Sequence, residues 1–180
     1  MGLIHRPEPV LLLVGMLSSS LEEFSAAREL LERRFGPVEL ESAPFPFEAT
    51  HYYDDELGTP ILRQFVAFTR LIDPGRLASV KGFTNELEHV RARKRGAQPR
   101  RPVNLDPGYL DAGRLVLATT KDRAHRLYLG QGIHAEVTLM YEKGAWQALP
   151  WTYPDYAAPT YHPFLIEARV SYLVRLRSGG

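Results

Sequence analysis

The sequence contains no cysteine, which excludes disulfide bonds, thiolate metal ligands and a cysteine nucleophile. It also has no excess of one charge, because 22 Lys and Arg residues stand against 21 Asp and Glu residues, a formal net charge of +1. A balanced charge gives no overall field that favours nucleic acid or a membrane surface. The longest apolar run, from Val10 to Leu17, is too short to cross a bilayer. These absences favour a cytoplasmic protein without a membrane partner.

Several sequence motifs of known chemistry are missing as well. The chain has no P-loop of the type G-x-x-x-x-G-K-[ST], no dinucleotide fingerprint and no G-x-S-x-G nucleophile turn. Its six histidines form neither H-x-x-x-H nor H-E-x-x-H, so metal ligands could meet only through the fold. We therefore assign no metal and no particular cofactor, and no pattern indicates the oligomeric state.

The first half of the chain has the pattern of alternating strands and helices. At 180 residues, of which 44% are hydrophobic, the chain 1–180 fits one globular domain. The run "VLLLVGMLSSS" predicts a buried strand, and Ser20 with Glu23 has the capping-box spacing for the helix that follows. "VELESAPFPF" and "ILRQFVAFTRLI" predict two further strands, and Asp73-Pro74 opens a second helix. With the next strand, this is the element order of a ferredoxin-like βαββαβ unit.

The second half begins after a basic, linker-like segment, residues 91–102. "VNLDPGYL" predicts an extended stretch that turns at Asp106–Gly108. "GRLVLATTK", "HRLYLG", "IHAEVTLMY" and "AWQAL" predict a meander of short strands. Residues 164–177 fit a helix and, by alternation, a strand almost as well; we favour the helix. The predicted fold class is α+β, a mainly antiparallel sheet with helices on one face and the other face open to solvent or ligand.

The predicted hairpins of this meander define a candidate site. Three-residue loops at Asp122–Ala124 and Gly130–Gly132 would place Thr120, Arg126 and Glu136 in a row across three strands. An arginine held between a hydroxyl and a carboxylate is oriented to bind phosphate or carboxylate. The alternative is an ordinary Arg126–Glu136 ion pair, because an exposed antiparallel face is normally polar.

A second candidate site is the basic segment. Six positive charges fall within eleven residues and could neutralise phosphates of RNA, which predicts salt-sensitive retention on heparin. The alternative is a solvated helix end, where cations also suit the helix dipole. The residues concerned are Arg91, Arg93, Lys94, Arg95, Arg100 and Arg101.

Motifs along nearly the whole chain resemble one family. They include "VGMLSS", "FPFEATHYYDDELG", "VNLDPGYL", "LVLATTKDRAHRLYLGQGIHAEVTL" and "PWTYPDY". Together they resemble the prokaryotic family catalogued as domain of unknown function 4416, for which no activity is established. The resemblance implies that five positions are candidates for a functional site, but it assigns no role to any of them: Asp106, Tyr109, Lys121, His125 and Arg126.

The function predicted from these patterns is binding of an anionic or phosphorylated small molecule or nucleotide, with an enzymatic reaction left open. Lys121 and Arg126 would bind anionic oxygens, Thr120 would donate a hydrogen bond, and His125 or Glu136 would transfer a proton. Asp106 would orient the ligand, and the apolar walls would be Tyr109, Tyr128 and Trp151. The alternatives are an RNA-binding module and a structural, partner-binding subunit.

Overall fold

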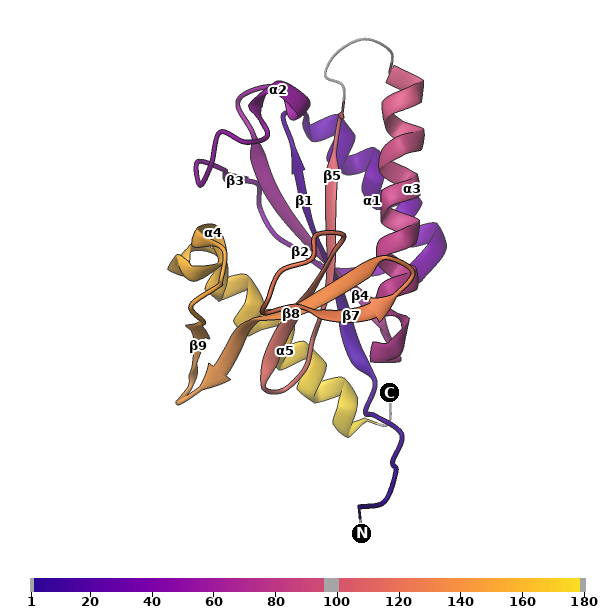
Figure 1. Ribbon diagram of the computed structural model, residues 1–180, viewed down its shortest axis with the longest axis vertical. Coiled ribbons are helices and arrows are strands. Elements are labelled where there is room, and N and C mark those ends of the chain that lie inside the picture. The colour runs from indigo at the N-terminus through magenta and orange to yellow at the C-terminus, as the bar shows by residue number, and fades with distance from the viewer. Residues whose placement is uncertain (1, 96–100, 179–180) are drawn as a thin grey trace.

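The computed structural model describes residues 2–95 and 101–178, without the side chains of residues 94 and 95. It is an α+β fold with one antiparallel sheet in the order β2-β4-β1-β5-β6-β8-β7, to which β3 is added on β4 and β9 on β8 (Figure 1). The strands are β1 Val10–Ser18, β2 Val38–Glu41, β3 Phe45–Pro46, β4 Leu62–Ile72, β5 Asn104–Leu110, β6 Arg114–Thr119, β7 Leu127–Gly130, β8 Ile133–Glu142 and β9 Ala145–Ala148. The helices are α1 Leu21–Phe35, α2 Asp54–Leu57, α3 Leu77–Arg95, α4 Pro154–Ala157 and α5 His162–Arg177, with short 3₁₀ turns at Pro74–Arg76 and Pro159–Tyr161.

Strand β1 lies in the middle of the sheet and is buried on both faces. Its residues alternate between two cores: Leu12 and Val14 pack with α1 and α3, whereas Leu11 and Leu13 pack with α5. The prediction of helices on one face only was therefore wrong. The reason is the continuous apolar run of β1, which must be covered on both sides, and α5 provides the second cover. The C-terminal helix itself is confirmed.

The elements of the first half follow the predicted order, with three local differences. The sheet order of the four strands concerned is β2-β4-β1-β5, and the ferredoxin-like comparison stays a prediction. The side chain of Ser20 makes no cap hydrogen bond, so the prediction of a capping box was wrong. Glu23 instead accepts hydrogen bonds from Arg91 at 2.9 Å. Helix α2 forms in a stretch for which the sequence predicts no element, and α3 continues through Arg95 into the predicted linker-like segment.

The predicted turn at Asp106–Gly108 is wrong, because these residues lie inside β5. A side chain at Gly108 would place its Cβ 2.4 Å from the carbonyl oxygen of Val116, so glycine allows β6 to approach here. Pro107 has no N–H, and the pairing of β5 with β6 covers only Gly108–Leu110. The two strands therefore separate beyond Gly108, and Asn104–Pro107 has no partner in β6.

The predicted strand pairing of the meander is wrong at one place and right at another. Strand β6 pairs with β8, and β7 lies outside β8 at the sheet edge, so the expected β6–β7 hairpin does not form (Figure 1). Between β7 and β8 the predicted pairing of Tyr128 with His134 is confirmed, but the predicted three-residue loop Gly130–Gly132 is wrong, because Gly130 pairs with Ile133. The turn itself contains only Gln131 and Gly132, both at positive φ, and a bulge at Leu129 restores the register.

Candidate functional site

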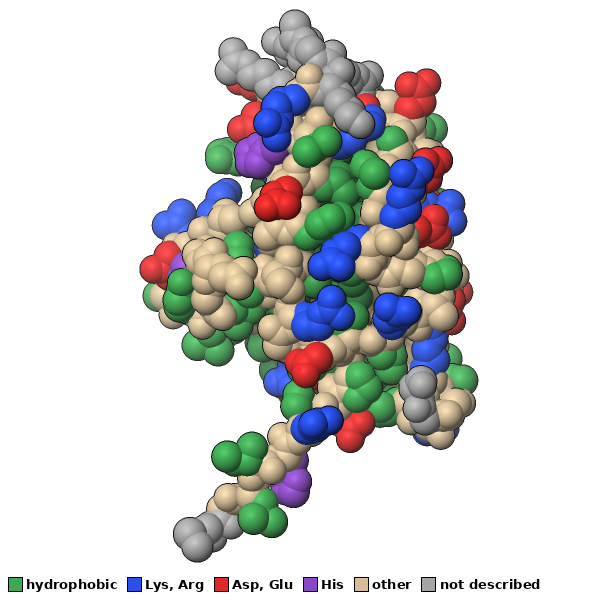
Figure 2. Space-filling view, turned by 90° about the vertical axis from the view of Figure 1, so that its right-hand side faces the viewer, with side chains coloured by type: hydrophobic (Ala, Val, Ile, Leu, Met, Phe, Trp, Pro, Cys, Tyr) green, Lys and Arg blue, Asp and Glu red, His purple; other side chains and the backbone are tan. Residues whose placement is uncertain are grey.

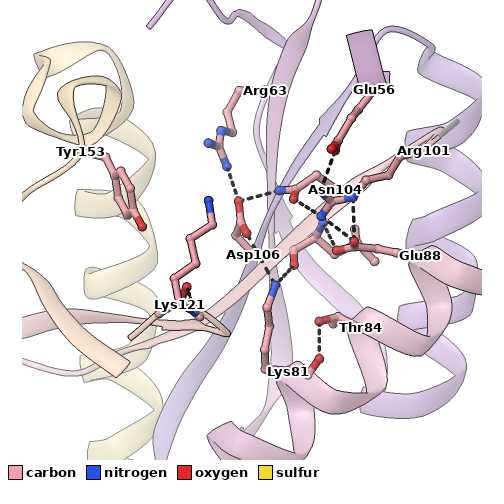
Figure 3. A network of polar contacts seen from close by, with 12 residues as sticks. Glu56, Arg63, Lys81, Thr84, Glu88, Arg101, Asn104, Asp106, Lys121 and Tyr153 are labelled. Carbon is pink, nitrogen blue, oxygen red and sulfur yellow. Dashed lines mark hydrogen bonds and ion pairs between the residues drawn. The ribbon is translucent and has the colours of Figure 1, made fainter. Parts of the chain in front are cut away.

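The separation of β5 from β6 opens a cavity of about 490 Å³. Its lining comes from β4 and β5, from the end of β6 with β8, from α3, from residues 47–56 and from the segment that carries α4. Cavities of this size are typical of small-molecule sites. Charged side chains project into it from several of these elements (Figure 3).

Arg63 from β4 is the most buried cation of the cavity, with only 4% of its side chain exposed. Its guanidinium lies 3.0 Å from Asp155 and 3.4 Å from Asp106, among the rings of Phe47, Phe65 and Tyr156. Burial acts to lower the pKa of Arg63, but the surrounding acidic groups, Tyr156 foremost, hold it above its usual value. The side chain is therefore fixed as a cation.

Gly15 on β1 leaves the space that Arg63 occupies. A Cβ at this position would lie 3.0 Å from Arg63 Nη1 and 3.0 Å from the Tyr156 hydroxyl. The register places Gly15 between Phe65 of β4 and Asp106 of β5. The glycine that interrupts the apolar run of β1 thus makes room for the charged network.

Asp106 is the meeting point of two cations from different elements (Figure 3). Besides Arg63, it has Lys81 Nζ of α3 at 3.7 Å, and the Asn104 amide donates to it at 2.7 Å. Burial alone would raise the pKa of Asp106, but Lys81, Arg63 and Asn104 together hold it below its usual value. Asp106 is thus stabilised as a carboxylate.

Helix α3 and the start of β5 are joined by further charges. Glu88 forms an ion pair with Arg101 at 2.6 Å and accepts the Leu105 N–H at 2.8 Å, and Lys81 donates to the Leu105 carbonyl at 2.7 Å. Arg101 also contacts Glu56 of α2 at 3.3 Å and hydrogen-bonds Asn104. Burial raises the pKa of Glu88, although Lys81 and Arg101 act against it. These contacts hold β5 in place while it is unpaired on its β6 side.

A second polar cluster surrounds Glu136 of β8. Its side chain is 1% exposed, and Oε2 accepts from Arg126 Nε at 2.7 Å and contacts His125 Nε2 at 3.0 Å. Arg126 also donates to the Tyr153 hydroxyl at 2.7 Å and to the Lys121 carbonyl at 2.8 Å. The other oxygen of Glu136, Oε1, is buried and has no hydrogen-bond partner among the residues that the structure describes.

Lys121 stands at the edge of the cavity. Its ammonium lies 4.8 Å from the centre of the Tyr52 ring and points toward the space in front of Asp106, as does the Tyr153 side chain (Figure 3). Nearby Tyr53 is partly buried, and this burial raises the pKa of its phenol to about 12. The edge of the cavity is therefore both aromatic and basic.

The structure brings together most of the predicted site, though not by the predicted geometry. Thr120, Lys121, Glu136 and Asp106 all line the cavity. Arg126 contacts Glu136 because the β7–β8 register is right, whereas Thr120 follows the end of β6 and is not in a row with them. The predicted hairpin at Asp122–Ala124, which would place Thr120 beside Arg126, does not form, because β8 takes the place next to β6.

The three predicted aromatic walls lie elsewhere. Trp151 stacks on His125, with ring centres 5.4 Å apart, and its indole donates to the Val137 carbonyl. Tyr128 is exposed on the edge strand beside His134, and Tyr109 packs in the cores under α3. The cavity instead has aromatic walls that the site prediction did not include: Phe47, Tyr52, Tyr53, Tyr153 and Tyr156.

The site prediction also missed Arg63, Lys81, Asn104 and Asp155. One signal was available for Lys81, because Leu77, Lys81, Thr84 and Glu88 share one face of α3 and all four are buried. A helix face that mixes leucine with buried charges indicates partners in the core. Arg63 gave a similar signal as a charge within the apolar run "ILRQFVAF".

The basic segment is partly neutralised within the fold. Arg91 pairs with Glu23 at 2.9 Å, and Arg101 pairs with Glu88 and Glu56. Arg93 is exposed and donates to the His89 carbonyl. The face that includes α3 mixes basic and acidic side chains (Figure 2). Arg100 and the side chains of Lys94 and Arg95 lie outside the described residues.

The described part of the chain shows neither a metal-binding cluster nor a helix able to span a membrane. Residues 2–95 and 101–178 contain no group of three or more His, Cys, Asp or Glu side chains placed to hold a metal ion. Within the same ranges, no helix has both the length and the apolar character needed to cross a membrane.

The fold and the site define an α+β protein whose antiparallel sheet opens onto a charged, aromatic-lined cavity. The family model described as "Domain of unknown function (DUF4416)" matches residues 8–172, and the chain belongs to this family. Comparisons with curated proteins and with solved structures found no match.

Proposed function

We propose that the protein binds an anionic small molecule, such as a phosphorylated metabolite or a nucleotide, in the cavity between β5 and β6. The observation that carries the proposal is a set of buried polar atoms without hydrogen-bond partners among the described residues. Three of them belong to side chains that line the cavity: Arg63 Nε, Glu136 Oε1 and Tyr156 OH. Four further atoms of this kind, on Arg28, His134, Thr138 and Trp146, belong to residues outside the lining. Buried polar groups are nearly always satisfied in folded proteins, so three such atoms on the side chains of one cavity support a ligand or ordered water there.

Lys121 is the cation best placed to meet the anionic group. Arg63, Lys81 and Arg101 each contact carboxylates of the protein. Within the described ranges, Lys121 alone among the cations of the cavity has no ion pair. An ammonium that is free and directed into a partly enclosed space is suited to bind an anionic oxygen.

His125 and Glu136 are the groups suited to proton transfer if the bound molecule reacts. Their 3.0 Å contact and the stacking of His125 on Trp151 fix the imidazole relative to the carboxylate. Glu136 lines the cavity and His125 does not, so a proton would pass between the bound molecule and Glu136, with His125 as the partner of that carboxylate. Binding is the first claim, and it can be tested without knowledge of the reaction.

A thermal-shift screen tests binding. The probes are inorganic phosphate, glucose 6-phosphate, AMP and ATP, each added to the whole chain. A probe present at about 100 times its Kd stabilises the folded state by about 2.7 kcal/mol, which raises the Tm by roughly 5–11 °C for a chain of this size. The Lys121→Gln variant should lose most of the shift, whereas Lys143→Gln, in the exposed β8–β9 turn, should keep it. A shift that is equal in both variants would place binding outside this cavity.

RNA binding by the basic segment stays a prediction. The pairing of Arg91 and Arg101 with carboxylates leaves fewer free charges for phosphate contacts than the sequence suggested.

A further inference from the structure

The cavity has as many acidic as basic side chains in its lining. Its bases are Arg63, Lys81, Arg101 and Lys121. Its acids are Glu56, Asp106, Glu136 and Asp155. The two charges immediately behind them, Arg126 and Glu88, also cancel each other. A site of this composition has no net positive charge to offer to a molecule that carries several negative charges.

Nearly all of these charges are already paired within the protein. Arg63 contacts Asp155 and Asp106, and Arg101 contacts Glu56. Arg126 neutralises Glu136 but bonds only its Oε2 atom. Among the described residues that line the cavity, Lys121 is the cation without an ion pair, and Glu136 is the carboxylate with a buried oxygen, Oε1, that has no hydrogen-bond partner. Arg63 Nε also lacks a hydrogen-bond partner, although the Arg63 guanidinium is paired with Asp155 and Asp106.

Lys121 and Glu136 require opposite partners. The ammonium of Lys121 needs one anionic oxygen, and Oε1 of Glu136 needs an N–H or O–H donor, best a cationic one. The lining also includes the aromatic side chains of Tyr52, Tyr53 and Tyr153. Their rings suit an apolar or cationic part of a ligand. A triphosphate in the same space would bring several charges beside Asp106, Asp155 and Glu56 with one free cation to meet them.

We propose that the ligand is a small zwitterion, with one carboxylate-like anionic group bound by Lys121 and one ammonium or amidinium group bound by Glu136. This inference rests on the cavity and the Lys121 contact of the proposed function, and it changes the ligand from a wholly anionic molecule to one with a charge of each sign. It selects amino-acid-like molecules over nucleoside di- and triphosphates. The binding site keeps its own pairs intact, and the ligand supplies one charge of each sign.

Matched probes separate the two ends of such a ligand. The whole chain is titrated calorimetrically with the common α-amino acids, with ω-amino acids and with dipeptides. The best zwitterion is then compared with its deaminated acid and with its decarboxylated amine. Loss of either charged group should weaken binding about tenfold or more, the loss expected from one charge-assisted hydrogen bond.

Two variants assign each end to its residue. Lys121→Gln should weaken binding of the zwitterion and leave binding of the amine unchanged. Glu136→Gln should weaken binding of the zwitterion and leave binding of the deaminated acid unchanged. Lys143→Gln and Glu142→Gln carry the same changes at residues that do not line the cavity, and they should bind like the original chain. Far-UV circular dichroism checks the fold of each variant. If Glu136→Gln does not fold, the comparison of zwitterion and amine binding by Lys121→Gln tests the proposal.

The outcomes distinguish the two proposals. If ATP or AMP binds more tightly than every zwitterion and depends on Lys121, the zwitterion inference is wrong and the proposed function stands. If no probe of either class binds at millimolar concentration, both are wrong. If zwitterions bind but Lys121→Gln and Glu136→Gln have no effect, the assignment of the two groups is wrong.

Discussion

Replacing Asp155 with asparagine tests how strongly the buried ion pairs hold the cavity together. The side chains of Asp155 and Arg63 are 8% and 4% exposed, and their charged atoms are 3.0 Å apart. Removing one partner of a buried pair costs about 3–5 kcal/mol, because the remaining charge is left in a poorly solvated position. Arg63 keeps Asp106 at 3.4 Å, so we expect a loss near the lower end, about 3 kcal/mol.

Urea unfolding followed by far-UV circular dichroism measures this loss. A change of about 3 kcal/mol corresponds to a Tm lower by roughly 6–12 °C for a chain of this length. Removing Arg63 as well should recover part of the loss, because no unpaired cation is then buried. The double variant Arg63→Met/Asp155→Asn should therefore be more stable than the sum of the single changes predicts, by about 1 kcal/mol or more.

A matched control removes a charge from an exposed pair. Glu29 and Arg33 lie 4.0 Å apart on α1 with side chains 70% and 75% exposed, so Glu29→Gln should change stability by less than about 0.5 kcal/mol. The reasoning is refuted if Asp155→Asn is as mild as this control. It is also refuted if the Arg63 and Asp155 changes are strictly additive.

Two further predictions concern the fold around the cavity. Gly108→Ala should lower stability by about 1–3 kcal/mol in urea unfolding, because its Cβ would lie 2.4 Å from the Val116 carbonyl oxygen; Gly113→Ala, where the nearest atom is 3.9 Å away, is the mild control. Tyr53 has its pKa raised from 10.0 to about 12, so its neutral phenol contributes stability below pH 10 that is lost as the pH rises toward 12. Tyr53→Phe should therefore lose less stability than the original chain between these pH values, and an equal loss would contradict the buried position of the phenol.

The parts of the fold that the sequence predicts well are those set by local pattern. The apolar run of β1 and the helical spacing of Leu21–Phe35 each specify their element without knowledge of the rest of the chain. Asp73 accepts the Gly75 N–H at 2.7 Å, as its place before Pro74 predicts. The pairing of Tyr128 with His134 is also predicted correctly and brings Arg126 to Glu136, although the turn is shorter than the expected loop Gly130–Gly132.

The parts of the fold that were predicted wrongly depend on which distant segments of the chain pair with each other. Strand β6 could pair with β7 or with β8, and alternation of side chains does not decide between them. The assumption that consecutive strands pair failed here, because residues 120–126 form a longer connection that carries β7 past β8. The same limit applies to Arg63 and Asp155, which lie 92 positions apart and meet only when α4 folds over β4.

The buried charges of the cavity are better explained by a ligand than by stability. Replacing a buried ion pair with apolar side chains of similar volume is often neutral or stabilising, so a network around Arg63 and Asp106 is not the most stable way to fill this space. Gly15 makes room for the Arg63 guanidinium, and Pro107 has no hydrogen-bond donor at the point where β5 leaves β6. Both residues weaken the sheet locally beside a cavity in which Arg63 Nε, Glu136 Oε1 and Tyr156 OH lack partners within the described chain. A bound molecule that satisfies Lys121 and Glu136 would return stability to the folded state in proportion to its affinity, which is why ligand-dependent melting is the measurement that decides the case.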